Sequence, residues 1–152
     1  MRRLARAFAM IPQDPARHAL WFGHWCYIGG HFDFVSAERE EGSAQRDVVK
    51  QAVMDVFRLR DRDLLVANMA QINLEFHDQL LTEDDEWDVH VAFYIVNLYG
   101  QAARERLSQH PDGRWLTNEE LISGTTSDGL PVNPVLTALL RRADLLRFDE
   151  ME

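Results

Sequence analysis

Residues 83–109 read EDDEWDVHVAFYIVNLYGQAARERLSQ, and the prediction of the fold rests on this stretch. Between positions 89 and 99 nearly every side chain is apolar, so a helix formed here would lack a wide polar face. A helix of that kind is normally surrounded by other helices. Thr82 and Asp85 have the spacing of a capping box, which starts the helix among the acidic residues. The stretch therefore predicts a buried central helix.

Signals of helix ends recur along the rest of the chain. Asp14–Pro15 suits the start of a helix, and Gly29–Gly30 suits its end. Thr117 begins a second capping box, and Asn133–Pro134 suits the start of the last helix. Apolar residues also recur at steps of three or four, at Leu65, Met69, Ile72, Phe76 and Leu80. We predict an all-α fold: a compact bundle of about six helices around residues 83–109, with one short extended segment near residues 31–35.

Length and charge limit the class of protein. The chain has 152 residues, of which 46% are hydrophobic, so we predict a single globular domain over residues 1–152. It carries 25 acidic and 16 basic residues, a formal net charge of −9. Nucleic-acid binding depends on neutralising phosphates with lysine and arginine, so no nucleic-acid partner is expected. The charge suits a protein partner with a basic surface, although excess charge also serves solubility alone.

The expected location is the cytoplasm. Cys26 is the only cysteine, so it cannot form an internal disulfide, which suggests a reducing compartment. The basic and then apolar start is like that of a signal peptide, but Arg6 interrupts the apolar run. No run approaches the roughly 20 apolar residues of a membrane span, so no membrane contact is expected.

An acidic run is the main surface feature that the sequence predicts. Helix capping needs one or two carboxylates, whereas this run has five within six residues. The surplus would form a binding surface if a second acidic group joined it, and otherwise it serves capping alone. The first group consists of Glu83, Asp84, Asp85, Glu86 and Asp88, and the second of Glu38, Glu40 and Glu41. Aromatic residues become binding anchors if the fold leaves them exposed, in particular Trp21, Trp25 and Phe32.

The main functional prediction is a non-enzymatic acidic protein-binding domain: an inhibitor, an immunity-type protein or an accessory protein. A narrower version is a phage- or plasmid-encoded inhibitor of a nucleic-acid-handling complex, which presents its acidic surface to a basic groove. No motif for a nucleophile, a phosphate loop or a cofactor is present, so no catalytic residue and no cofactor are predicted. The stretch 122–129, for example, lacks the lysine of a phosphate-binding loop.

The alternative prediction is a metal-dependent helical enzyme or metal sensor. Its ligands would be Asp, Glu and His side chains on two facing helices, which is how helical bundles hold metals. These candidates are Glu75, His77, Asp78, Glu86 and His90. Their spacing does not match Glu-x-x-His, and core or surface histidines are commoner than ligands. His18 and His24 are six residues apart, so they do not converge on one helix face. A third reading, a DNA-binding regulator using Arg58, Arg60 and Arg62, is disfavoured by the net charge.

Overall fold

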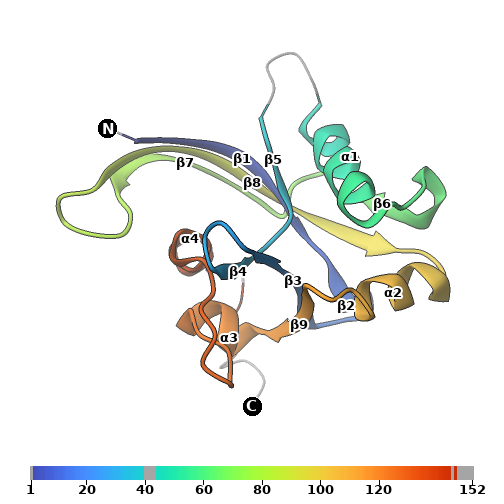
Figure 1. Ribbon diagram of the computed structural model, residues 1–152. Helices are drawn as coiled ribbons and strands as arrows, with labels where there is room; N and C mark the ends of the chain where they lie inside the picture. Colours follow the sequence, from blue (N-terminus) through green and yellow to red (C-terminus); the bar gives the residue numbers. More distant parts are fainter. Residues whose placement is uncertain (1, 40–43, 145, 147–152) are drawn as a thin grey trace.

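The computed structural model describes residues 2–39, 44–144 and 146, and its fold is mixed α/β (Figure 1). The larger sheet has the strand order β5–β1–β8–β6, and β7 also pairs with β8. Its strands are β1 (Arg2–Met10), β5 (Ser36–Glu38), β6 (Leu64–Val66), β7 (Ile72–Gln79) and β8 (Glu86–Leu98). The smaller sheet has β3 between β2 and β4, and β9 pairs with β3 as well. Its strands are β2 (Pro12–Asp14), β3 (Arg17–Cys26), β4 (His31–Asp33) and β9 (Gly113–Thr117).

The helices of the described residues are short. They are α1 (Gln45–Phe57), the 3₁₀ helix η1 (Asp61–Asp63), α2 (Gln101–Ser108), α3 (Asn118–Ser123) and α4 (Pro134–Ala143). None of these helices is long and apolar enough to cross a membrane. The prediction of an all-α bundle of about six helices is therefore wrong.

Strand β8 replaces the predicted central helix over residues 83–109. It pairs in parallel with β1 from Arg2 to Met10, and antiparallel with β7 and then β6 along its other edge. Both faces of β8 are covered along most of its length, so an all-round apolar composition is what a central strand needs. Valine, isoleucine and aromatic residues dominate it and favour strands. Only the last part of the predicted helix is helical, as α2.

Two other predicted helices are also strands. Asp14 is the last residue of β2, directly before the turn to β3, and its carboxylate accepts a hydrogen bond from the backbone N–H of Ala16 at 2.9 Å. The apolar residues of β7 alternate with polar ones. Apolar residues four positions apart lie on one face of a strand as well as of a helix, which is why this spacing also predicts a helix. The extended segment expected near residues 31–35 is present as β4.

The starts of the last two helices are as predicted. The side chain of Thr117 accepts from the backbone N–H of Glu120, and that of Glu120 accepts from the backbone N–H of Thr117, each at 3.0 Å. Asn133 caps α4, and Pro134 is at its first turn. Capping motifs are local, so they survive an error in the global fold.

Helix α1 covers one face of the larger sheet. Ala7, Ala9 and Ala92 are at most 1% exposed there, and their small side chains let Val49 and Val53 of α1 pack closely. The ends of β1, β7 and β8 that lie near the N-terminus extend beyond α1 (Figure 1). This leaves part of that face open beside the helix.

The other face of the larger sheet packs on the smaller sheet and on α3 and α4. The rings of Phe8 and Phe93 stack here with centroids 5.0 Å apart. Leu136, Leu139 and Leu140 of α4 are fully buried in the same cluster. The larger sheet therefore lies between two apolar layers, and the part of its face beside α1 is left uncovered by the described residues (Figure 1).

Candidate active site

Three arginines line a pocket of about 350 Å³ between the start of β1 and the end of β5. We call it the arginine pocket; its lining residues are Arg3, Leu4, Ala5, Arg6, Glu38 and Arg39. Side chains alternate along β1, so Arg3 lies on the α1 face with Ala7 and Ala9, whereas Arg6 lies on the other face with Phe8. The positive charges of Arg3 and Arg39 favour an anion. Arginine binds phosphate and carboxylate groups through two parallel hydrogen bonds, which adds geometric specificity to the charge.

Arg39 has an unused donor in this pocket. When the carboxamide of Gln45 is turned with its oxygen towards the guanidinium, it accepts hydrogen bonds from Nε, at 2.9 Å, and from Nη2 of Arg39. The backbone N–H of Arg39 donates to the carbonyl of Ala5 at 3.1 Å. Nη1, however, is buried and has no hydrogen-bond partner among the described residues. A buried, charged donor without an acceptor is costly, which points to an anionic ligand at this atom.

The other two arginines differ in how they are held. Nε of Arg6 donates to the hydroxyl of Ser36 at 2.8 Å, and Nη2 donates to the backbone carbonyl of Ser36 at 3.2 Å. Arg3 is exposed and forms no ion pair with any residue that the structure describes. Its positive charge is therefore available to a ligand.

A groove of about 490 Å³ runs along α1 beside the arginine pocket. This α1 groove is lined by Ala37, Ala44, Asp47, Val48, Gln51, Ala52 and Asp55. Ala37 lines the groove and the next residue, Glu38, lines the arginine pocket, so β5 contributes to both hollows. Asp47, Gln51 and Asp55 follow at steps of four and share one face of the helix. Nε2 of Gln51 donates to Asp55 at 2.7 Å, which orients this carboxylate.

The carboxylates of the α1 groove suit a magnesium ion that substrate phosphates also bind, but not an ion held by both carboxylates. Asp47 and Asp55 are eight residues apart, about 12 Å along a helix, so they cannot share one ion. Magnesium is usually held by one or two carboxylates together with the phosphates of a substrate. Either Asp47 or Asp55 suits a magnesium ion that is bound at the same time by the phosphates of a substrate. Glu40 and Glu41, of the second predicted acidic group, lie outside the described residues.

The residues of the predicted alternative metal site lie on strands and not on facing helices. Glu75 of β7 stands opposite His90 of β8, with 4.0 Å between Oε1 and Nδ1. Asp88, which was not among the predicted ligands, is 2.8 Å from Nε2 of His90. Asp78 pairs with Trp87 on the other face of the sheet and forms an ion pair with Arg142.

His77 and Glu86 complete the predicted set. His77 stands opposite Asp88, and Glu86 stands opposite Gln79 at the end of the β7–β8 pairing. The structure thus brings Glu75, His77 and His90 to the face of the sheet that α1 partly covers. Arg3 pairs with Asp88 in the register between β1 and β8, so this polar strip borders the arginine pocket.

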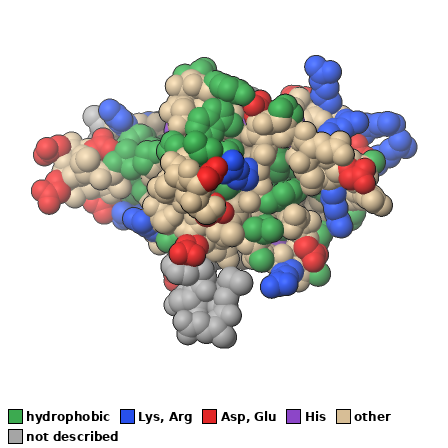
Figure 2. Space-filling model, turned by 60° about the horizontal axis from the view of Figure 1, so that its bottom comes forward, with side chains coloured by type: hydrophobic (Ala, Val, Ile, Leu, Met, Phe, Trp, Pro, Cys, Tyr) green, Lys and Arg blue, Asp and Glu red, His purple; other side chains and the backbone are tan. Residues whose placement is uncertain are grey.

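The predicted acidic run lies at the turn between β7 and β8, so it does not cap a helix. Asp85 accepts a hydrogen bond from the indole of Trp87 at 2.5 Å and is 3.8 Å from Nε of Arg2. Figure 2 shows acidic side chains at the end of the molecule formed by this turn, while lysine and arginine gather at the opposite end. Glu38 lies on β5, at the opposite edge of the sheet from β7. Glu38, the described member of the second predicted acidic group, therefore does not join the first group along the sheet.

The predicted aromatic anchors are mostly interior. Trp21 and Phe32 are 2% and 5% exposed, and the indole N–H of Trp21 donates to Oδ1 of Asn118 at 2.7 Å. Trp25 is partly buried and packs edge-to-face on Phe32, with centroids 4.9 Å apart. These residues hold the smaller sheet together and do not form an exposed patch.

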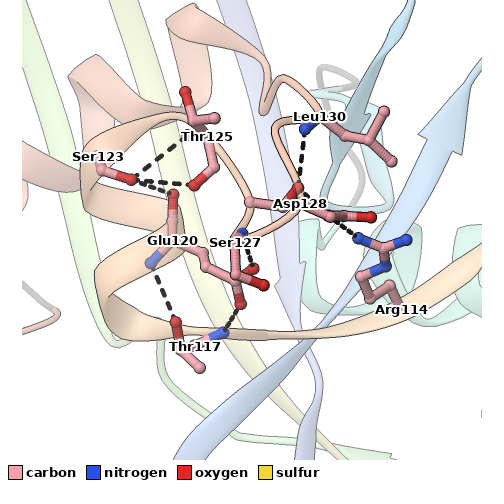
Figure 3. A network of polar contacts seen from close by, with 9 residues as sticks. Arg114, Thr117, Glu120, Ser123, Thr125, Ser127, Asp128 and Leu130 are labelled. Carbon is pink, nitrogen blue, oxygen red and sulfur yellow. Dashed lines mark hydrogen bonds and ion pairs between the residues drawn. The ribbon is translucent and has the colours of Figure 1, made fainter.

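The glycine-rich loop at residues 124–130 uses its backbone donors internally (Figure 3). The N–H of Ser127 donates to Glu120 at 2.9 Å, and that of Leu130 donates to the hydroxyl of Thr126 at 2.9 Å. Asp128 pairs with Arg114 at 2.6 Å, and together with the hydroxyl of Thr126 this arginine lowers the pKa of that carboxyl. This loop is therefore a structural element, in line with its rejection as a phosphate loop.

Sequence reasoning missed the arginine pocket. The alternation of Arg3, Ala5 and Ala7 with Leu4 and Arg6 fits a strand, but the start of the chain reads equally well as a short amphipathic helix. Arg39 comes from a different part of the chain and reaches Arg3 only through the β1–β5 pairing. No local signal joins these two residues.

Comparison with known proteins adds the fold. The sequence matches no protein family model, and no curated protein matches it. Among solved structures, a Nudix hydrolase from M. smegmatis, RenU, is similar with a TM-score of 0.51 and 14% identity over 98% of this chain and 92% of that one. The Ap4A hydrolase of C. elegans is similar with a TM-score of 0.52 and 11% identity, over 95% of this chain and 97% of that one.

A protein whose structure was solved in complex with DNA has a similar fold. NrtR of Shewanella oneidensis, complexed with a 27mer DNA, is similar with a TM-score of 0.52 and 8% identity, over 91% of this chain and 59% of that one. At such identities the similarity concerns the fold alone, since one fold hosts many functions. The predicted helical, non-enzymatic binding domain is nevertheless wrong, because the chain has a mixed α/β fold that occurs in hydrolases. This chain has the fold of the Nudix hydrolases.

Proposed function

We propose that the chain hydrolyses the phosphoanhydride bond of a pyrophosphate-linked nucleotide. The arginine pocket binds a phosphate group, and the reaction takes place in the α1 groove. The observation that carries the proposal is the buried Nη1 of Arg39, which has no hydrogen-bond partner among the described residues and lies in a three-arginine pocket. The fold supports it, because RenU is a Nudix hydrolase and the C. elegans protein is an Ap4A hydrolase.

The arginines have the role that phosphoryl transfer requires. Catalysis of this reaction depends on positioning and on stabilising charge at the phosphate oxygens. Arg6 lies on the opposite face of β1 and is held by Ser36, so Arg3 is the second arginine that we assign to the anion. Arg39 contributes the free Nη1, and Gln45 keeps its plane in place. A magnesium ion that accompanies the substrate would neutralise further charge on the same oxygens.

Asp55 is the residue that we assign to the attacking water. It stands ten residues after Gln45, about 15 Å along α1, so the phosphorus attacked there is not the one held by Arg39 but another phosphate of the same substrate. Gln51 orients the carboxylate of Asp55 in the groove, and a carboxylate accepts a proton from water in general base catalysis. The oxygen of the water bonds to phosphorus while the bridging P–O bond breaks, and one proton of the water passes to Asp55. The bridging oxygen leaves with the second phosphorus. A nucleoside diphosphate sugar thus gives a nucleoside monophosphate and a sugar phosphate, and a longer polyphosphate chain is divided into two fragments that share its phosphates.

Turnover of a substrate panel tests the proposal. Nucleoside diphosphate sugars, dinucleoside polyphosphates and nucleoside triphosphates are incubated with the full chain and magnesium, and products are separated by ion-exchange chromatography. We expect Arg39→Ala to raise KM and Asp55→Asn to lower kcat by about a hundredfold. Arg104→Ala, on the exposed side of α2, and Asp84→Asn, in the β7–β8 turn, are the matched controls. No turnover in any class, or equal turnover in Asp55→Asn, would overturn the assignment.

A further inference from the structure

Two histidines and one aspartate form a compact cluster away from the arginine pocket and the α1 groove. His24 lies on β3, while His110 and Asp112 lie in the turn between α2 and β9. One donor atom from each of the three side chains lies within 4.8 Å of the other two. Among the described residues this is the only such group of three His, Cys, Asp or Glu side chains. We call it the imidazole cluster.

Backbone pairing fixes these three side chains close together. In the register between β3 and β9, His24 stands opposite Gly113, the residue after Asp112. The N–H of Trp25 donates to the carbonyl of Asp112 at 2.7 Å, and the N–H of Gly113 donates to the carbonyl of His110 at 3.1 Å. A side chain at Gly113 would collide with the ring of Phe22, so only glycine allows this close approach. The cluster is therefore built into the fold.

The surroundings of the cluster suit a metal site. The ring of Phe57, at the end of α1, packs edge-to-face against both imidazoles. Its centroid is 5.8 Å from that of His24 and 5.4 Å from that of His110. This apolar floor excludes water from one side, whereas all three ligand residues remain partly exposed on the other. The hydroxyl of Tyr27 donates to Oδ1 of Asp112, and such an outer hydrogen bond orients a metal-binding carboxylate.

The donor set also suits a dication. A neutral imidazole has the free lone pair that a metal needs. Two imidazoles and one carboxylate match the three protein ligands of several zinc sites, in which a fourth position is open to water.

We propose that His24, His110 and Asp112 form a binding site for a first-row transition-metal dication, for which zinc is the probe. Donor atoms on one tetrahedral zinc ion lie about 3.4 Å apart, so the side chains have to rotate inward on binding. Nδ1 of His110 now accepts a hydrogen bond from the N–H of Asp112 at 3.1 Å. Binding through either nitrogen of His110 replaces that hydrogen bond, since binding through Nε2 requires a proton on Nδ1.

Zinc titration of the chelator-treated full chain tests the site. Competition with a chromophoric chelator should give one zinc ion per chain, and zinc should raise the Tm of the metal-free protein. His24→Gln and His110→Gln should each weaken zinc binding by about tenfold or more, and so should Asp112→Asn, which keeps an acceptor for Tyr27. His77→Gln, on β7, should bind zinc as the parent does.

Cobalt gives a second readout that separates ligation from folding. Co²⁺ in a four-coordinate site of this type should show visible ligand-field absorption, which Asp112→Asn should shift even if its Tm equals that of the parent. Absence of saturable zinc binding would overturn the proposal. Equal zinc affinity in His24→Gln, His110→Gln and the parent would overturn it too. Because the site is separate from the arginine pocket, none of these results depends on whether the chain hydrolyses nucleotides.

Discussion

The carboxamide of Gln45, at the start of α1, accepts hydrogen bonds from Nε and Nη2 of Arg39 when its oxygen faces the guanidinium, and Nη1 has no hydrogen-bond partner among the described residues. This contact joins the arginine pocket to the helix that lines the neighbouring groove. In the proposed function, phosphate binding and the position of α1 are therefore coupled through one side chain. An arginine side chain that no hydrogen bond holds in place would lose more conformational entropy when it binds an anion.

Replacing Gln45 tests this coupling. Gln45→Leu keeps the size of the side chain but removes both hydrogen bonds, so Arg39 is no longer oriented. We expect the affinity for inorganic pyrophosphate to fall by about three- to tenfold, because a hydrogen bond to a charged group contributes about 1.5–3 kcal/mol and part of it is regained by reorientation. Isothermal titration calorimetry measures this. An unchanged affinity would show that Gln45 does not position the guanidinium.

The C-terminal end of α1 carries a testable backbone strain. Arg58 adopts the left-handed conformation, with φ at 54°, and its N–H donates to the carbonyl of Met54. Residues other than glycine adopt this conformation at a cost of about 1–2 kcal/mol. Arg58→Gly should therefore raise the free energy of unfolding by about 0.5–1 kcal/mol, since the gain is partly offset by the greater freedom of glycine in the unfolded chain.

Arg104→Gly is the matched control, because it places glycine inside α2, where the backbone is helical. It should lower the free energy of unfolding by about 1 kcal/mol. Urea denaturation monitored by tryptophan fluorescence measures both variants. Changes of the same sign in the two variants would contradict the assigned strain at Arg58.

Asp33 predicts a pH dependence of stability. Burial raises the pKa of its carboxyl above the ordinary value of 3.8, against the hydrogen bonds from Asn133 and Phe34 and the charges of His31 and Arg6, which lower it. The folded state thus binds this proton more tightly than the unfolded state. The resulting stabilisation is present below pH 3.8 and is lost as the pH rises through the raised pKa.

The comparison of Asp33→Asn with the parent isolates this effect, since other titrating groups cancel in the difference. Asparagine does not titrate, so the stability of the variant relative to the parent should increase as the pH rises from about 3.5 to 7. Urea denaturation at several pH values measures the difference. A difference that stays constant over this range would contradict the raised pKa.

Local signals in the sequence predicted local structure correctly. The capping box at Thr117 and the start of α4 at Asn133 depend on neighbours within three residues, and both are present. The segment at residues 86–98 was misread because a strand buried on both faces and a buried helix have the same composition. Its 13 residues also exceed the usual length of a strand, which favoured the helical interpretation.

The candidate site could not be predicted from the sequence because it depends on distant pairing. Arg3 belongs to β1 and Arg39 follows β5, and the two line one pocket only when β1 pairs with β5. The imidazole cluster has the same origin, since His24 and His110 meet through the β3–β9 register. A helical interpretation of either segment separates these residues.

The most direct test of the proposed phosphate site is the binding of a nucleoside diphosphate analogue with a non-hydrolysable methylene bridge, measured by isothermal titration calorimetry. This measurement does not depend on the rate of any reaction. The account predicts saturable binding to the parent, with about tenfold or greater loss of affinity in Arg39→Ala and no loss in Arg104→Ala. Equal affinity in the parent and in Arg39→Ala would contradict it.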